Sequence, residues 1–395
     1  MTRVLDRSYP SMLALAVLAV LVAACVRPME PTAPVPPPPP LTDLNLVGAA
    51  SALAADLERQ MSPGLTRSMV IDPLLDSRTG QQTVATTRVQ QELIQAFVAK
   101  ISQATILKFD GAGAGQARLL VSGTLTALPD ANRFRMTVAL SDRHSGIVVA
   151  QAATQFVEAG MDPTPTRFYA DSPSLVRDRS VEGHMKTAET PAGQAADTLY
   201  MEQVPTSALL ADALEAYNAE RWSDSLALYN TAVLRPDGQQ LRTFNGIYLA
   251  NVQLGQLAAA EEAFSKIAAL GLATNNLAVK LLFKPGATEF WPDPKVSGVY
   301  PMWLKQIAKV ALASGSCLNV VGHTSASGTE GFNEKLSLAR AGAIRERLER
   351  EAPGIARKSQ VSGVGSRENL VGTGTDDASD AIDRRVEFKV VACTP

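Results

Sequence analysis

A polar loop between two regular elements carries the residues best suited to binding a small charged ligand. The apolar, β-prone run 318–321 ends at Gly322, a small polar loop follows, and Asn333 opens a helix. Two turns into that helix, Arg340 supplies a planar guanidinium, which can pair with a carboxylate through two parallel hydrogen bonds. A strand, a loop and the start of a helix together predict a site for a small polar ligand.

The stretch 317–340 resembles the central motif of the OmpA-like peptidoglycan-binding domain, which is G-H-T-D, a short loop and N-x-x-L-S-x-x-R-A. Here the match is Gly322-His323-Thr324, then Asn333, Leu336-Ser337 and Arg340-Ala341, with Ser325 in place of the family's Asp. The resemblance implies that the loop and helix hold diaminopimelate of the peptidoglycan stem peptide, the Asp pairing with its ammonium and the Arg with its carboxylate. The candidate peptidoglycan-binding residues are therefore His323, Thr324, Ser325, Asn333, Leu336 and Arg340.

Some of these residues have a structural role as the alternative. Arg340 lies at the edge of the inward helix face, where it either binds ligand or pairs with an acid in the segment 376–380. Asn333 either contacts the ligand or caps the helix, a role that Asn favours. His323 is expected to orient the loop.

Ser325 weakens the expected binding. A hydrogen bond to a charged group contributes roughly 1.5–3 kcal/mol and a neutral one about 1 kcal/mol, so losing the carboxylate can cost an order of magnitude in affinity. Glu330 lies in the same loop and is a possible replacement. The other possibilities are a domain with a purely structural role or a preference for a different stem peptide.

The region 275–395 is predicted to fold as a βαβαββ OmpA-like α/β sandwich with one mixed sheet. Strands are expected at 279–283, 318–321, 360–364 and 384–391, and helices at 300–313 and 333–350. The segment Asp383-Arg384-Arg385-Val386-Glu387 also resembles the family's last strand, which begins N-R-R-V-E. If the second and third strands are parallel and the fourth is antiparallel, Cys317 and Cys393 meet at one sheet edge, and we predict a disulfide between them.

The N-terminus reads as a targeting segment. Residues 1–24 have a basic start and a short apolar run, as in a signal peptide, and the sequence Leu21-Val22-Ala23-Ala24-Cys25 resembles a bacterial lipobox. That resemblance implies acylation of Cys25 and a lipid anchor, and Val26 favours the outer membrane, with the protein facing the periplasm. Residues 25–41 then comprise the acylated Cys25 and a proline-rich stalk, in which the run 28–40 spans ~40 Å in polyproline II geometry.

The middle of the chain is predicted to mediate protein contacts. Residues 42–160 predict an α+β accessory domain, with two helices on a mostly antiparallel sheet, which weakly resembles FlgO and penicillin-binding-protein-activator lipoproteins. Within it, the loop 111–115 is expected to be a flexible connection, because it lacks a phosphate-binding fingerprint. Residues 161–204 show no sustained period and are expected to form a linker.

Residues 205–272 carry an internal repeat, in which Trp222, Ser225, Tyr229 and Ala232 recur as Leu257, Ala260, Phe264 and Ile267. The spacing is close to the tetratricopeptide period and predicts short all-α hairpins. Two such repeats are fewer than independent stability usually needs, so they are expected to pack on a flanking domain or a partner. A generic helical hairpin is the alternative.

Composition limits the function. A formal net charge of −2 and an aromatic content of 5% argue against nucleic-acid binding. No cofactor, metal site or enzyme motif is expected, since three His and two unacylated Cys make no ligand set. The sequence predicts a multidomain lipoprotein that binds peptidoglycan and envelope proteins, or an assembly scaffold of a secretion, pilus or motility machine that has lost peptidoglycan binding.

Overall fold

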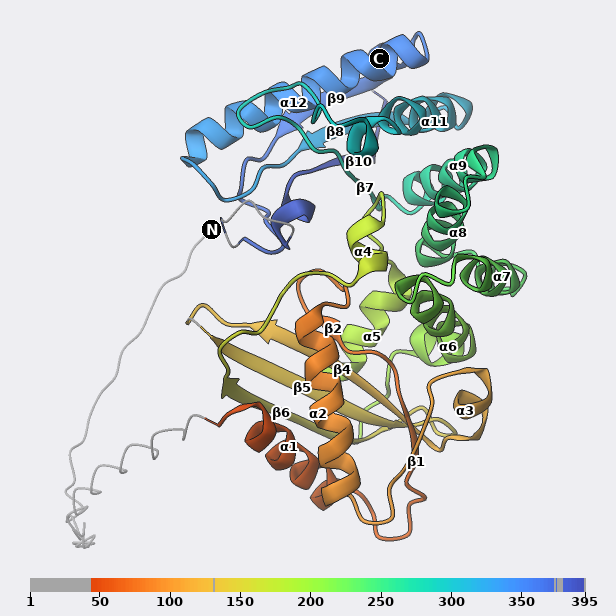
Figure 1. The fold of residues 1–395 in the computed structure, drawn as a ribbon, viewed down its shortest axis with the longest axis vertical. Helices are drawn as coiled ribbons and strands as arrows, with labels where there is room; N and C mark the ends of the chain where they lie inside the picture. Colours follow the sequence, from red (N-terminus) through yellow and green to blue (C-terminus); the bar gives the residue numbers. More distant parts are fainter. Residues whose placement is uncertain (1–43, 131, 373, 375–378, 394–395) are drawn as a thin grey trace, which may run out of the picture. The chain divides into compact units, whose positions relative to one another are not determined.

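The computed structural model describes residues 44–130, 132–372, 374 and 379–393. The predicted signal peptide, Cys25 and the proline-rich stalk lie outside these residues. Across this part of the chain, helices combine with two separate β-sheets, as expected for a multidomain protein of mixed class (Figure 1). None of its helices is both long and apolar enough to cross a membrane.

The first sheet has six strands in the order β3-β1-β4-β5-β6, and β2 pairs with β4. The strands are β1 (Ser68–Ile71), β2 (Leu75–Asp76), β3 (Thr105–Leu107), β4 (Leu119–Ala127), β5 (Arg133–Asp142) and β6 (Val148–Val157). The long pairings of β5 with β4 and β6 are antiparallel, whereas β4 pairs in parallel with β1 and β2. The sheet is therefore mixed, with its longest pairings antiparallel.

Helices cover one face of this sheet as the sequence predicts. Helices α1 (Leu46–Gln60) and α2 (Val84–Lys100) lie side by side on it (Figure 1). Their Leu53 and Leu93 share a buried cluster with Val121 of β4. Each helix starts at a side-chain cap: Asn45 accepts from the Gly48 amide, and Thr83 forms a reciprocal capping box.

The linker prediction for the segment 161–204 is wrong, because the segment forms helices, two of which pack on the other face of the sheet. It contains α4 (Arg167–Asp171), α5 (Arg179–Glu189) and the start of α6 (Thr198–Asn218). Leu120, which points away from α1 and α2, packs with Tyr200 of α6. Helix α5 is amphipathic but only 11 residues long. Its buried face includes polar groups with partners, such as His184 Nδ1, which lies 3.0 Å from Asp72 Oδ2.

The glycine-rich loop is also not a flexible connection. Residues Gly111–Gln116 form the short helix α3, and Asp110 caps it by accepting from the Gly113 amide. The hydrogen bond from this cap stabilises the helix and offsets the low helix propensity of its glycines.

The repeat region consists of consecutive packed helices: α6, α7 (Trp222–Val233), α8 (Leu241–Gln253) and α9 (Leu257–Ala273). Helices α7 and α9 begin at the equivalent repeat positions, and each buries its aromatic residue, Tyr229 or Phe264. Gly246 is required where α8 crosses Tyr229, because a Cβ there would lie 2.2 Å from the ring.

The second sheet has four strands in the order β7-β10-β8-β9. The region contains β7 (Leu277–Lys280), α10 (Pro294–Ser297), α11 (Tyr300–Ala313), β8 (Cys317–Gly322), α12 (Glu330–Glu351), η1 (Ile355–Lys358), β9 (Ser359–Gly363), η2 (Ser379–Asp383) and β10 (Arg385–Val391). The predicted strand at 279–283 is shifted toward the N-terminus, because Phe283 pairs instead with Phe290 in an isolated bridge.

The predicted disulfide is present between Cys317 and Cys393, with Cα atoms 5.2 Å apart. Strand β8 is parallel to β9 and antiparallel to β10, so that Val391 pairs with Cys317 at one end of these two central strands. The bond therefore joins the two strands that meet there.

The helices and the second sheet share one core. Phe264 of α9 stacks on Trp303 of α11, with ring centroids 5.3 Å apart, and Trp303 Nε1 donates to the Tyr248 hydroxyl at 2.9 Å. A single buried cluster includes these residues and Phe388 of β10. The helical hairpins thus obtain hydrophobic cover from the sheet region.

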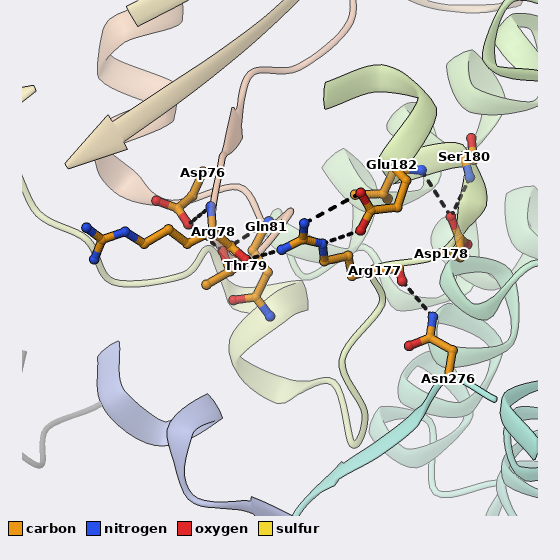
Figure 2. Close-up of polar contacts among 10 residues, drawn as sticks. Asp76, Arg78, Thr79, Gln81, Arg177, Asp178, Ser180, Glu182 and Asn276 are labelled. Carbon is orange, nitrogen blue, oxygen red and sulfur yellow. Dashed lines mark hydrogen bonds and ion pairs between the residues drawn. The ribbon is translucent and has the colours of Figure 1, made fainter. Parts of the chain in front are cut away.

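A polar junction links three segments that are far apart in the sequence (Figure 2). The Arg177 guanidinium donates to the Arg78 carbonyl and pairs with Glu182, while the Arg177 carbonyl accepts from Asn276 Nδ2 at 2.6 Å. The turn that carries Arg78 is closed by Asp76, which accepts from the Thr79 amide and hydroxyl. Arg177 thereby connects the β2 turn, the start of α5 and the end of α9.

Candidate ligand-binding groove

A groove of about 440 Å³ lies beside the N-terminal half of α12. Four segments form it: the hairpin after β7, the loop after β8, one face of α12 and Arg384 just before β10. Five of the six predicted site residues line it, namely Thr324, Ser325, Asn333, Leu336 and Arg340. The structure thus brings together residues that the sequence motif had only spaced along the chain.

Two glycines let α12 lie directly on the sheet. A Cβ at Gly322 would be 2.1 Å from the Ser337 carbonyl oxygen, and one at Gly363 would be 2.3 Å from the Leu338 nitrogen. The fully buried Ser337 hydroxyl accepts from the Gly365 amide at 2.9 Å. These contacts fix the helix, and with it Arg340, against the strand ends.

Asn333 holds the loop and does not cap the helix, so the capping alternative for this residue is wrong. Thr329 is the N-cap, and its hydroxyl accepts from the Phe332 amide. Asn333 lies inside α12, where its Nδ2 donates to the Ser327 carbonyl at 2.9 Å and, at 3.4 Å, to the Ser325 carbonyl. The side chain therefore sets the loop conformation from the helix.

Arg340 is fixed on the groove wall by the hairpin opposite. Its Nε donates to the Ala287 carbonyl at 3.0 Å, one Nη donates to the Lys284 carbonyl at 3.2 Å, and its guanidinium carbon lies 4.8 Å from the Phe283 ring centroid. Only 5% of the residue is exposed. These contacts hold the planar guanidinium in one orientation. The predicted acidic partners at 376–380 lie outside the described side chains.

Ser325 lines the groove, and Glu330, which lies outside the lining, does not replace the missing charge. The Ser325 hydroxyl lies 3.1 Å from that of Ser327, and the residue is 5% exposed. Glu330 accepts from the Ser366 hydroxyl at 2.6 Å and pairs with Arg367 at 3.2 Å, and it is not part of the groove lining. The described lining contains two guanidiniums, from Arg340 and Arg384, and no carboxylate.

His323 lies beneath the loop instead of facing the groove. Its amide donates to the Arg385 carbonyl at 3.1 Å, and its Nε2 is 3.4 Å from Glu387 Oε1. Burial lowers the pKa of His323. Burial opposes ionisation of Glu387, yet the facing His323 ring and the Arg385 guanidinium hold the pKa of that carboxyl well below its usual range. The contacts of His323 with Arg385 and Glu387 attach the loop to β10, which is consistent with the orienting role expected of His323.

The same histidine belongs to a potential metal-ligand set. Ligand atoms of His323, Glu368 and Glu387 lie within 4.8 Å of one another. However, Glu387 already accepts from Arg385 Nε at 2.8 Å and pairs with Lys389 at 3.0 Å. Two cations thus already bind this carboxylate, and the arrangement fits a buried ion-pair network better than a metal centre.

The groove residues that sequence reasoning missed include the two exposed aromatic residues Trp291 and Phe332. A helical signal could have found Phe332, because it lies four residues before Leu336 and eight before Arg340 and so shares their helix face. Trp291 lies in an irregular hairpin, where no periodicity indicates orientation.

Comparisons with known proteins give only local structural likenesses. No protein-family model matches the chain, and no curated protein matches it either. The peptidoglycan-associated lipoprotein from Burkholderia pseudomallei aligns with 28% of this chain and 88% of its own, at 23% identity and a TM-score of 0.24. The cell wall anchor of the T6SS from Pseudomonas aeruginosa aligns with 29% of this chain and 80% of its own, at 24% identity and a TM-score of 0.24. The periplasmic domain of Helicobacter pylori MotB aligns with 29% of this chain and 74% of its own, at 17% identity and a TM-score of 0.24.

Proposed function

We propose that the chain binds peptidoglycan without catalysis, through the stem peptide in the groove beside α12. The observation that carries the proposal is the convergence of Thr324, Ser325, Asn333, Leu336 and Arg340 on one groove. These are the positions that match the OmpA-like motif, and they come from a loop and a helix that the glycine contacts hold together.

The groove chemistry suits a ligand with a free carboxylate. Arg340 offers a fork that the hairpin carbonyls already orient, and a charge-assisted pair with a carboxylate contributes roughly 1.5–3 kcal/mol. The Ser325 hydroxyl can accept from an ammonium but adds no charge. Diaminopimelate presents both groups, so its carboxylate would carry most of the affinity.

In this proposal the chain reaches the wall from the outer membrane. Acyl chains on Cys25 would anchor it, since each buried CH₂ contributes about 0.8 kcal/mol, and the proline-rich stalk would carry the folded part into the periplasm. The tetratricopeptide-like hairpins and the N-terminal sheet would bind other envelope proteins. The chain would thereby link the outer membrane, or an envelope complex, to peptidoglycan.

A second candidate is an assembly scaffold that no longer binds the wall. Two observations favour it: the described groove lining has no carboxylate, and the packing of α9 on α11 joins the hairpins and the second sheet in one core. Such a shared core would give the sheet region a structural role in presenting the helices.

Cosedimentation with purified peptidoglycan separates the two candidates. Wild type should pellet, Arg340→Ala should remain in the supernatant, and Arg350→Ala should pellet, because Arg350 is exposed near the end of the same helix. Circular dichroism would verify that each variant is folded. If wild type stays soluble while Ser325→Asp pellets, the scaffold candidate is correct.

The anchor is tested by fractionation without detergent. Wild type should remain with the membrane, and Cys25→Ala should be released. Continued tight membrane association of Cys25→Ala would contradict the lipid anchor.

A further inference from the structure

Two aromatic side chains of the groove are exposed to solvent. Phe332 is 53% exposed and Trp291 is 38% exposed, although both line the groove that holds Arg340. Exposed aromatic surface at the rim of a polar groove is typical of a binding surface. Neither residue is needed to explain recognition of a stem peptide by Arg340 and the loop.

The position of Phe332 along α12 is informative. Phe332, Leu336 and Arg340 repeat at four-residue intervals, and all three line the groove. At 1.5 Å of rise per residue, Phe332 lies about 12 Å along the helix from Arg340. Its ring is near Gly286 of the hairpin and Gly328 of the loop, since a Cβ at either glycine would be within 3.9 Å of it. It therefore lies between the two loops that border the groove.

The length of a peptidoglycan stem matches this separation. Diaminopimelate is the third residue of the stem, whose first residue is joined to the glycan strand. An extended chain spans about 3.3–3.6 Å per residue, which places the sugar about 10 Å from the diaminopimelate. With the diaminopimelate carboxylate on Arg340 and the stem running along α12, the sugar reaches Phe332.

We propose that Phe332, assisted by Trp291, stacks on the sugar ring that carries the stem peptide, so that the ligand is a muramyl peptide rather than a free peptide. The negative face of an aromatic ring attracts the C–H groups on the flat side of a pyranose. The hydroxyls of Ser325 and Ser327 in the same groove can hydrogen-bond the polar edge of the ligand. This inference rests on the proposed function and extends it to the glycan.

Calorimetric titration of the full chain with two defined ligands tests the inference. One ligand is the diaminopimelate stem tripeptide, and the other is the same tripeptide joined to N-acetylmuramic acid. Wild type should bind the muramyl tripeptide about three- to tenfold more tightly, the range expected of one aromatic contact. Phe332→Ala should lose this difference, and Phe332→Tyr should retain it. Leu338→Ala is the matched control, because Leu338 is 45% exposed on the same helix but outside the groove lining.

Each possible result of the titration either supports or overturns the proposed contact between Phe332 and the sugar. A sugar-dependent gain that disappears only in Phe332→Ala supports stacking on the glycan. Equal affinity of wild type for the two ligands overturns the inference and leaves the proposed function intact. Absence of binding to either ligand overturns both, and a gain that survives in Phe332→Ala overturns the role of this residue.

Discussion

Loss of the disulfide between Cys317 and Cys393 should destabilise the second sheet strongly. The bond joins residues 76 apart in the sequence. In the chain-entropy description, closing a loop of that length lowers the entropy of the unfolded chain by an amount worth about 4.5 kcal/mol at 25 °C. That is a large share of the 5–15 kcal/mol that stabilises a typical domain. The Cys317→Ser/Cys393→Ser variant, which leaves no free thiol at the site, should therefore unfold much more readily.

Urea unfolding followed by tryptophan fluorescence measures the effect, because Trp303 is buried in the shared core. With a slope of about 3 kcal/mol per molar urea, the midpoint should fall by about 1.5 M. Reduction of wild type should reproduce the shift, since Cys393 is exposed to the reductant. Cys25→Ser is the control and should leave the midpoint unchanged. Equal midpoints for oxidised wild type and the double variant, or two free thiols in the oxidised protein, would refute the reasoning.

Three further predictions concern stability, each measured as a shift in unfolding midpoint. Burial lowers the pKa of Lys280 to about 8. Between pH 8 and 10.5 the unfolded chain therefore binds more protons than the folded chain, so the free energy of unfolding should rise with pH over that window by about 1 kcal/mol relative to Lys280→Met. Parallel pH profiles of wild type and Lys280→Met would contradict this prediction. Gly246→Ala should cost about 1–3 kcal/mol because its Cβ meets the Tyr229 ring, whereas Gly342→Ala, with open space around its Cβ, should be neutral or stabilising; equal effects would disprove the steric argument. Thr329→Ala should cost about 1 kcal/mol through loss of the α12 cap, and an unchanged midpoint would argue against the cap.

Long amphipathic elements were predictable from the sequence because one strong period determines each of them. Helix α11 buries Leu304, Ile307 and Ala311 at helical spacing, and strand β8 is a short apolar run. The antiparallel pairing of β8 with β10 brings the cysteines together as expected. Helix α5 was missed, because it is only 11 residues long and its buried face carries polar side chains such as His184, whose partner Asp72 is distant in the sequence. No local pattern can show that such a group is satisfied.

The candidate site also has features that the sequence predicts and features that depend on distant contacts. The motif placed Arg340 and Ser325 on one groove, since the spacing of a strand, a loop and a helix is a local property. The role of Asn333 depends on which carbonyls the loop turns toward it, and the engagement of Glu330 depends on Arg367 of a later loop. Those contacts are set by tertiary packing and required the structure.

The central claim is that the groove beside α12 binds the stem peptide of peptidoglycan. Titration of the isotopically labelled chain with the soluble diaminopimelate tripeptide, followed by backbone amide resonances, tests it most directly. We predict saturable shifts at Thr324, Ser325 and Asn333, all of which line the groove, and their loss in Arg340→Ala. Unchanged resonances at these residues at saturating peptide, or shifts confined to other parts of the chain, would contradict the claim.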